Sequence, residues 1–349
     1  MKNYDLVIIT NVPAFYKINL FNQLSDKLKL KVIFISKISK IRNHDFYNYD
    51  INFDHAFLSE GAFEDRSSFK TLYNLFIELT KIKYERVLFP GWEIKELFFL
   101  SLITKVKKNA IVIESSINES KVKGISGFLK KIYLSRMGSA YPSGFLQKEI
   151  LLNMDFKGRS YLTHGVGIIN DSPVTDININ EKVTRLKYIY IGRLSQEKNL
   201  LLLIKVFNEL QFPLIIVGTG PQEDELKSAA NENIIFKGYI QNKTLHALLK
   251  ECNVFILPSI SEPWGLVVEE ALASGLPVVV SNKVGCNKDL VDAENGIIFN
   301  PHDAECLKTS ILNMEKNYSG FKYAALNYNI QVRNTLQINS YVESMKNEK

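Results

Sequence analysis

Short apolar runs alternate along the chain with segments in which apolar residues recur every three or four positions. In the first half, the apolar runs, each the length of a strand, are residues 4–10, 31–35, 86–89 and 110–113. Continuous apolar runs are typical of parallel strands buried on both faces. The segments with helical spacing between them are residues 18–28, 69–81 and 95–105. This alternation predicts an α/β domain with crossover helices.

The alternation starts again in the second half. Strands are predicted at 187–191, 213–217, 233–237, 254–257 and 277–281, and helices at 199–210, 222–230, 243–251 and 266–274. A linker rich in Asn, Asp and Ile is predicted at 165–181, and the last 30 residues, 320–349, are predicted to be helical.

Two strand–helix series of similar length predict two doubly wound, Rossmann-like domains that face each other across a central cleft. The predicted first domain covers residues 1–168 plus 330–349, so that a C-terminal helix crosses back to it, and the second covers 174–329. Ligands of such sheets lie beyond the carboxyl ends of the strands, where the strand order reverses. The cleft between the two sheets is therefore the expected ligand site.

Composition narrows the class of protein. Of 349 residues, 46% are hydrophobic and 23% charged, which is a soluble globular composition. No apolar run approaches the roughly 20 residues that span a bilayer, and residues 1–10 contain no small-residue cleavage site of a signal peptide. The three cysteines are too widely spaced for a metal site or a disulfide framework, which favours the reducing cytoplasm.

Charge is unevenly divided between the halves. Residues 1–173 hold 25 Lys and Arg against 17 Asp and Glu, a net charge of +8, whereas the remainder has a net charge of −2. No nucleic-acid-binding signature accompanies this excess, so no nucleic-acid partner is expected. The run 121–136 mixes cations with bulky apolar residues at helical spacing, which fits either an anionic membrane surface or an ordinary surface helix with a core face.

The most informative segment, residues 258–275, follows an apolar run and opens a predicted helix near Gly265. Backbone N–H groups and the dipole at a helix N-terminus bind phosphate, and glycine lets an anion come close to the backbone. Glu262 lies in the loop, and Glu270 lies eight residues later on the helix. Carboxylates accept hydrogen bonds from sugar hydroxyls, so phosphate donors beside hydroxyl acceptors fit a nucleotide sugar.

A second loop, residues 192–199, also joins an apolar run to a predicted helix. Arg193, as a planar fork, and Lys198, as a point charge, are expected to converge on one anion. Two positive charges suit a departing diphosphate, although either residue alone is more typical of a solvated surface. Glu269 is predicted to be solvated or to face the helix dipole, and 218–220 is predicted to be mainly a tight strand-to-helix turn.

These segments give the region from 187 to 304 a recognisable pattern, which resembles the retaining glycosyltransferases of family 4, enzymes with the GT-B fold. The order and spacing of the following segments carry the resemblance: Gly192-Arg193-Leu194 with Glu197-Lys198, Val217-Gly218-Thr219-Gly220-Pro221, Phe236-Lys237-Gly238-Tyr239, Glu262-Pro263-Trp264-Gly265 through Glu270, Ala273-Ser274-Gly275-Leu276-Pro277-Val278-Val279, Gly285 with Asp289, and Asn295-Gly296. The first half is only loosely similar to this family.

The resemblance implies roles residue by residue. Arg193 and Lys198 match the pair that holds the donor diphosphate and neutralises the leaving group. Glu262 matches a glutamate that touches hydroxyls of the transferred sugar, and Glu270 matches one that holds the ribose. Other donor contacts, largely through the backbone, are implied for Gly192, Tyr239, Trp264, Gly265, Leu266 and Val267. Such enzymes usually need no metal or other cofactor, and the chain contains no Asp-x-Asp triplet.

The first half departs from the family pattern in two places. Many members have a Gly-Gly pair in the loop after the first strand, where this chain reads Asn11-Val12-Pro13-Ala14-Phe15-Tyr16-Lys17. Lys17 is interpreted as the replacement for that backbone contact. Glu114 stands where many members have a histidine near the transferred sugar, and is the candidate replacement. His164 is interpreted as a hinge residue, and Trp92 either lines the acceptor cleft or packs in the core.

Together these features predict a retaining glycosyltransferase that uses a nucleotide diphosphate sugar, a UDP-sugar in preference to a GDP-sugar. The acceptor is expected to be a hydroxyl of a glycan or a lipid-linked glycan. A composition rich in Lys, Ile and Asn, with a basic first domain, suggests O-antigen, capsule or other surface polysaccharide synthesis, in the cytoplasm or peripherally on the inner face of its membrane.

Two alternatives remain open: a non-catalytic sugar-nucleotide-binding subunit, and a nucleotide-sugar epimerase of the same fold. The epimerase needs acid and base carboxylates and histidines in the cleft, and that set is not apparent. A dinucleotide dehydrogenase is disfavoured because no Gly-x-Gly-x-x-Gly follows the first strand.

Overall fold

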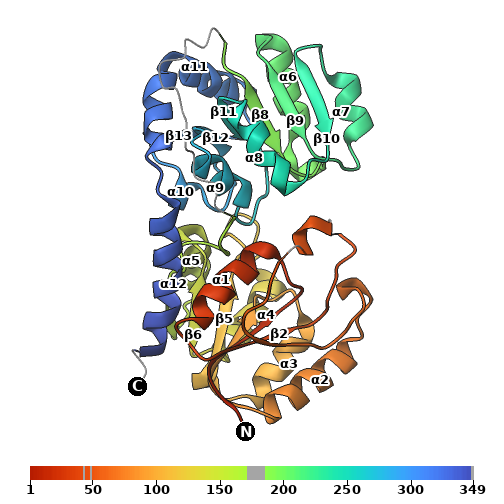
Figure 1. Cartoon of the computed structure of the whole chain (residues 1–349), viewed down its shortest axis with the longest axis vertical. Helices are drawn as coiled ribbons and strands as arrows, with labels where there is room; N and C mark the ends of the chain where they lie inside the picture. Colours follow the sequence, from red (N-terminus) through yellow and green to blue (C-terminus); the bar gives the residue numbers. More distant parts are fainter. Residues whose placement is uncertain (42–43, 48, 171–184, 347–349) are drawn as a thin grey trace. The chain divides into compact units, whose positions relative to one another are not determined.

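The computed structural model describes residues 1–41, 44–47, 49–170 and 185–346. Most of the predicted linker, from residue 171 onward, lies outside these described residues. The chain divides into two compact units, residues 1–170 with 331–349 and residues 171–330. Each unit is built on its own parallel sheet (Figure 1).

The first unit contains a seven-stranded sheet in which every pairing is parallel. In spatial order its strands are β3 (Asp54–Phe57), β2 (Leu30–Phe34), β1 (Asn3–Thr10), β4 (Lys83–Pro90), β5 (Asn109–Ile113), β6 (Ser139–Pro142) and β7 (Arg159–Ser160). The strand order reverses between β1 and β4, as is typical of doubly wound sheets.

Helices cover both faces of this sheet. Those of the first unit are α1 (Phe15–Ser25), α2 (Ser68–Thr80), α3 (Lys95–Ile103), α4 (Gly124–Ser135), α5 (Phe145–Asn153) and α12 (Ile330–Lys346). Apolar residues of α2, α3, α4 and α5 pack in one core on one face. Residues of α1 and α12 pack in a second core on the other face.

A fully buried arginine joins the C-terminal helix α12 to the first sheet. Arg86 on β4 donates hydrogen bonds to the Tyr141 hydroxyl and to the Ser344 carbonyl, the latter at 3.3 Å. The rings of Tyr141 and Tyr341 stack with centroids 5.2 Å apart. The prediction that a C-terminal helix returns to the first domain is therefore confirmed.

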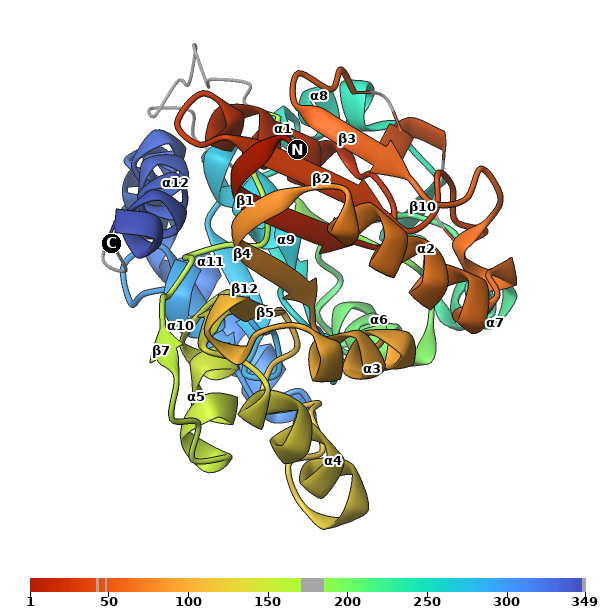
Figure 2. The same ribbon diagram turned by 90° about the horizontal axis from the view of Figure 1, so that it is seen from below.

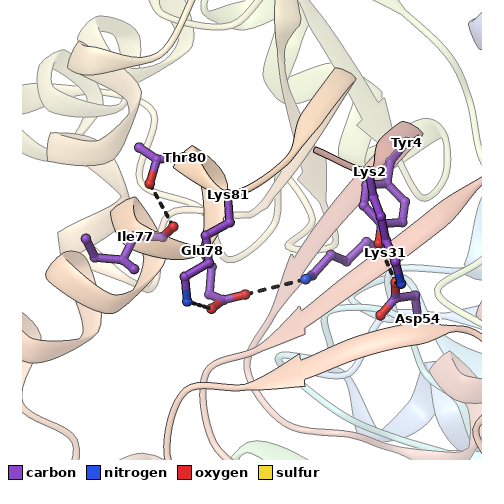
Figure 3. Close-up of polar contacts among 8 residues, drawn as sticks. All are labelled: Lys2, Tyr4, Lys31, Asp54, Ile77, Glu78, Thr80 and Lys81. Atoms are coloured by element: carbon purple, nitrogen blue, oxygen red, sulfur yellow. Dashed lines mark hydrogen bonds and ion pairs between the residues drawn. The ribbon is translucent and has the colours of Figure 1, made fainter.

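Polar contacts fasten the outer strands of this sheet and helix α2 (Figure 3). Lys31 on β2 is largely buried and reaches Glu78 of α2 at 3.4 Å, and Lys81 pairs with the same carboxylate at 2.7 Å. Asp54 of β3 accepts from the Tyr4 hydroxyl and pairs with Lys2 at 3.0 Å. Charge pairing thus permits a lysine inside a strand that has little exposure to water.

The second unit contains a six-stranded parallel sheet. Its strands, in spatial order, are β10 (Ile234–Gly238), β9 (Leu214–Val217), β8 (Tyr188–Ile191), β11 (Val254–Leu257), β12 (Val278–Ser281) and β13 (Gly296–Phe299). Its helices are α6 (Leu200–Leu210), α7 (Glu223–Ala229), α8 (Asn242–Lys250), α9 (Leu266–Ala273), α10 (Asn287–Leu290) and α11 (Ala304–Leu326). The order reverses between β8 and β11, so the prediction of two Rossmann-like sheets is confirmed.

We expect Arg86→Ala to lower the free energy of unfolding by roughly 3 kcal/mol, because the hydroxyl of Tyr141 and the carbonyl of Ser344 would keep their burial and lose a charged donor. Lys2→Ala, which removes an exposed ion pair, is the control and should cost less than about 1 kcal/mol. Chemical denaturation measures both variants. Equal losses would contradict the anchoring role of Arg86.

Candidate functional site

The residues that the sequence singled out in the second unit follow the two strands at which the sheet order reverses. Arg193 and Lys198 follow β8, and Glu262 and Gly265 follow β11, which pairs directly with β8. The carboxyl ends of these parallel strands lie at one edge of the sheet, where open α/β sheets bind ligands. The fold thus brings the two predicted loops to one place.

An ion pair between Lys198 and Glu262 joins these loops directly. The Lys198 ammonium donates to a carboxylate oxygen of Glu262, and each side chain is 15% exposed. Arg193, by contrast, is exposed. The Lys198 ammonium, which suits a phosphate, and the Glu262 carboxylate, which suits sugar hydroxyls, therefore lie together as an ion pair. A second cation, Arg193, is nearby in sequence.

The local backbone conformation and the hydrogen bonds of Asn199 fix the position of Lys198. It ends a short 3-10 turn, Gln196–Lys198, and the next residue, Asn199, adopts a left-handed conformation with φ of 58°. The side-chain amide of Asn199 donates to the backbone carbonyls of Pro258, at 3.3 Å, and Pro301, at 2.8 Å. Asparagine tolerates this conformation better than most residues, so Asn199 is a site-building residue that the sequence reading missed.

The loop between β11 and α9 is held rigidly before the helix begins. Gly265 has φ of 95°, and a Cβ there would lie 2.9 Å from Val284 Cγ1, so only glycine fits without strain. The Glu262 carbonyl accepts from Gly285 N–H and the Trp264 carbonyl from Cys286 N–H, each at 2.9 Å.

The first turn of α9 can bind an anion. Helix geometry leaves the N–H groups of Leu266 and Val267 without intrahelical acceptors, whereas Val268 N–H bonds to the Gly265 carbonyl at 2.9 Å. Glycine at the helix start allows a phosphate to approach these donors. The Trp264 side chain is buried, so this residue offers mainly backbone to a ligand.

Three glycines let the neighbouring loops of the second sheet touch. A Cβ on Gly218 would lie 1.9 Å from the Gly192 carbonyl oxygen, and one on Gly220 would lie 2.3 Å from the Leu194 carbonyl oxygen. Leu194 N–H donates to the Thr219 carbonyl at 3.0 Å. Residues 218–220 belong to the short connection from β9 to α7, and their packing supports the loop that carries Arg193.

Tyr190, on strand β8, supports the loop that carries Arg193. Its hydroxyl donates to the Arg193 carbonyl at 2.9 Å. Burial, and then the charges of Glu262 and Glu197, hold the pKa of Tyr190 well above its usual value, so it remains a donor. Tyr190 lies in a predicted strand, where its alternation with apolar neighbours gave no sign of this role.

The adjacent glutamates of α9 differ from each other. Glu269 is only 3% exposed, so the prediction that it is solvated is wrong, although it does lie in the first turn of the helix. Glu270 is partly buried. Burial, followed by the charge of Glu269, raises the pKa of Glu270 to about 7.

Tyr239, one of the implied donor contacts, lies beside the outer strand β10. Tyr239 follows this strand and is 43% exposed. Gly238 has φ of 65°, and its carbonyl accepts from Gly218 N–H at 2.8 Å. The segment next to Tyr239 is therefore attached to the loop between β9 and α7, while the tyrosine ring itself is accessible to solvent.

In the first unit, Lys17 and Glu114 form a second ion pair, 2.7 Å between Nζ and Oε1. They follow β1 and β5, so they lie at the carboxyl edge of the first sheet. Helix α1 begins at Phe15, which corrects the assignment of Lys17 to a loop: it lies in the first helical turn. A cation is unfavourable there, and Glu114 offsets it.

Two other predicted residues of the first unit have structural contacts. Trp92 packs against the core, and the Lys130 ammonium lies 4.6 Å from its ring centroid, which favours the packing interpretation. His164 has φ of 59°, and its carbonyl accepts from Arg333 of α12 at 2.6 Å.

Within the described ranges, no group of three or more His, Cys, Asp or Glu side chains is placed to hold a metal ion. Over the same part of the chain, no helix has the length and apolar character needed to cross a membrane.

A family model described as "Glycosyl transferases group 1" matches residues 174–333. An uncharacterized glycosyltransferase of Methanocaldococcus jannaschii is 31% identical over 128 residues, which cover 34% of this chain and 33% of that protein. An uncharacterized 41.2 kDa protein in the cps region of Klebsiella pneumoniae is 25% identical over 313 residues, covering 80% and 84%.

The O-antigen chain mannosyltransferase B of Escherichia coli is 29% identical over 136 residues, which cover 36% of this chain and 35% of that enzyme. This chain thus spans about a third of the length of the M. jannaschii and E. coli relatives.

Solved structures share the whole fold. Sucrose-phosphate synthase from Thermosynechococcus elongatus aligns with a TM-score of 0.72 at 16% identity, over 99% of this chain and 98% of that one. The Anabaena protein Alr3699/HepE in complex with UDP aligns with a TM-score of 0.67 at 14% identity, over 99% and 100%. At these identities the likeness shows the architecture alone.

We expect Glu270→Gln to change the pH dependence of stability. The pKa of Glu270 is about 7 in the folded protein against 4.5 ordinarily, so the folded state keeps a proton that the unfolded chain releases. The carboxyl therefore destabilises the fold progressively as pH rises from 4.5 to 7.

The neutral variant should match the wild type near pH 4.5 and exceed it by about 1 to 3 kcal/mol near pH 8. Thermal unfolding at the two pH values measures this difference. Glu294→Gln, at an exposed loop position, is the control and should give no pH-dependent gain. An equal gain for both variants would show that Glu270 has no special environment.

Proposed function

We propose that the protein is a glycosyltransferase that moves a sugar from a nucleotide diphosphate donor to a hydroxyl of a glycan, since the family model "Glycosyl transferases group 1" matches residues 174–333. The observation that carries this proposal is the joining of Lys198 to Glu262 beside the N-terminus of α9, at the point where the sheet order reverses. Phosphate donors and a sugar-hydroxyl acceptor lie together there.

The proposed donor site divides the nucleotide sugar among neighbouring groups. Lys198, Arg193 and the N–H groups at the start of α9 bind the diphosphate and stabilise the charge that grows on it as the sugar departs. Glu262 accepts from hydroxyls of the transferred sugar. Glu270 accepts from the ribose, and backbone near Tyr239 and Gly192 binds the base and adjoining phosphate. This division needs no metal ion.

We propose retention at the anomeric carbon through internal return. The bond between the anomeric carbon and the diphosphate oxygen breaks, and the acceptor oxygen bonds to the same face. The acceptor proton passes to the departing diphosphate. Glu262 is already paired with a cation, which makes it a poor nucleophile. Detection by mass spectrometry of a covalent sugar adduct on Glu262 or Glu114 would contradict this mechanism.

We propose UDP as the nucleotide, since a structural neighbour that aligns over the whole chain binds UDP. The K. pneumoniae relative, encoded in a cps region, and the O-antigen mannosyltransferase support surface polysaccharide synthesis as the setting. A lipid-linked glycan at the cytoplasmic face of a membrane is the proposed acceptor, because the first unit is basic.

The test is release of nucleoside diphosphate from UDP-, GDP-, dTDP- and ADP-sugars, with a membrane lipid extract of the source as acceptor. Release that requires the extract establishes a transferase and identifies its donor. Binding without release under any condition would indicate a non-catalytic sugar-nucleotide-binding subunit. No binding of any sugar nucleotide would overturn the proposal.

Lys198→Ala and Glu262→Gln should separate the two halves of the ion pair. We expect Lys198→Ala to lower turnover at least about 100-fold and to weaken nucleoside diphosphate binding, because leaving-group charge loses its partner. Glu262→Gln should lower turnover while binding nucleoside diphosphate as tightly or more tightly, because Lys198 is no longer neutralised.

Calorimetry and initial rates measure the two effects. Lys205→Ala, at an exposed position on α6, is the control and should match the wild type. Parallel weakening of nucleoside diphosphate binding in both variants would contradict the assignment of the two residues to different parts of the donor.

The ion pair of the first unit predicts coupling between Lys17 and Glu114. We expect Lys17→Met and Glu114→Gln each to lower kcat/KM, and the double variant to lose no more than the worse single one, because the pair acts as one unit. Thermal stability should change little, since the pair is partly exposed. Additive losses would show that the two side chains act independently.

A further inference from the structure

The outer sides of α3 and α4 expose large apolar side chains to water. On α4, Ile125, Phe128 and Leu129 are 81%, 64% and 54% exposed. On α3 these side chains belong to Phe99, Leu102 and Ile103, which are 57%, 48% and 62% exposed. Exposed apolar side chains that gather on one side of a helix indicate an interaction site, whereas scattered single residues do not.

Each set of three has the same helical spacing, and the helices that carry the two sets are in contact. Positions i, i+3 and i+4 lie on one side of a helix. The ring of Phe98 on α3 lies 5.8 Å from that of Tyr133 on α4, and Arg136, which ends α4, donates to the Ser101 carbonyl at 3.3 Å. Both helices cover the same face of the first sheet (Figure 2).

Helix α4 is anchored at its C-terminal end, so its first two turns are left outside the core. Tyr133 and Leu134 are buried in the core cluster. Near the start of the helix, Gly127 packs against the Val122 backbone, where a Cβ would lie 2.3 Å from the carbonyl oxygen. This close packing holds the start of the helix in place, and Ile125, Phe128 and Leu129 remain exposed to water.

Cations surround these apolar residues. Between Lys95 and Arg136 the chain has nine Lys and Arg against three Glu. One of those glutamates, Glu96, is buried and paired with Arg66 at 2.9 Å, so it contributes little to the surface. The exposed lysines of this stretch are Lys95, Lys105, Lys107, Lys121, Lys123 and Lys131. Apolar side chains bordered by lysines complement a lipid leaflet with anionic headgroups.

We propose that this surface, the α3–α4 face formed by the two sets of three residues and the six lysines, docks the protein on an anionic membrane leaflet. The apolar side chains enter the boundary between headgroups and acyl chains, and the lysines bind lipid phosphates. This inference rests on the proposed function, because docking on a membrane would bring the proposed donor site to a lipid-linked acceptor.

The test is flotation of the full-length protein with vesicles of phosphatidylcholine alone or mixed with phosphatidylglycerol. We expect binding to the mixed vesicles only, weakened by added salt. Ile125→Ser combined with Phe128→Ser should lower the partition coefficient at least about tenfold, because each removes an apolar side chain that would be buried in lipid. Lys123→Gln combined with Lys131→Gln should also lower it.

Leu312→Ser combined with Lys316→Gln, at exposed positions of α11 in the second unit, is the matched control and should bind vesicles as the wild type does. Sedimentation of all variants at several concentrations tests a different occupant, a second copy of this chain. Self-association lost in Ile125→Ser with Phe128→Ser, without vesicle binding by the wild type, would overturn the membrane proposal, as would equal binding by the α3–α4 and control variants.

Nucleoside diphosphate binding by the same samples separates this proposal from the proposed function. All α3–α4 variants should retain wild-type affinity, since the substitutions lie in the other unit. Nucleotide binding without vesicle binding refutes the membrane surface and leaves the transferase intact. Vesicle binding without consumption of any sugar nucleotide refutes the transferase and supports the surface alone.

Discussion

The reversal of strand order between β8 and β11 is the constraint on which the candidate site depends. Because these strands are neighbours and parallel, the loops that follow them leave the sheet at one edge, although Lys198 and Glu262 are 64 positions apart in sequence. Lys198 then reaches Glu262, and the turn that holds the lysine is bonded to the opposite loop, with Ile260 N–H donating to the Glu197 carbonyl at 2.9 Å. The ion pair of Lys198 with Glu262 joins the loop after β8 to the loop after β11.

Backbone packing gives this meeting point its rigidity. Gly192, Gly218 and Gly220 lie where a side chain would collide with a neighbouring carbonyl or hydroxyl group, so adjacent loops can touch. Gly265 starts α9 in a left-handed conformation, and the first N–H groups of the helix have no intrahelical acceptor. Such preorganised donors stabilise developing negative charge without reorganisation during reaction.

The first unit has the same doubly wound topology with different surface features. Its reversal lies between β1 and β4, and the ion pair of Lys17 with Glu114 lies at the corresponding edge. Its charge excess is concentrated on helices α3 and α4 and their flanking loops, beside apolar residues that the sheet does not bury. The same doubly wound topology can thus carry the ion pair of Lys198 with Glu262 in one unit and a basic, partly apolar surface in the other.

The sequence by itself determined the two parallel sheets, most of their helices and the loops that carry Arg193, Lys198, Glu262 and Gly265, because long apolar runs and helical spacing are local signals. It missed β3, β6, β7 and β13. β3 (Asp54–Phe57) is a half-buried edge strand with polar residues, and β6 (Ser139–Pro142) is short and contains serine and proline. β7 (Arg159–Ser160) and β13 (Gly296–Phe299) are edge strands of two and four residues. Only the tertiary structure decided that Glu269 is buried, that Lys17 pairs with Glu114, and that Tyr190 and Asn199 hold the loop of residues 192–199. Those contacts join residues from different elements, and local patterns contain no information about which elements meet.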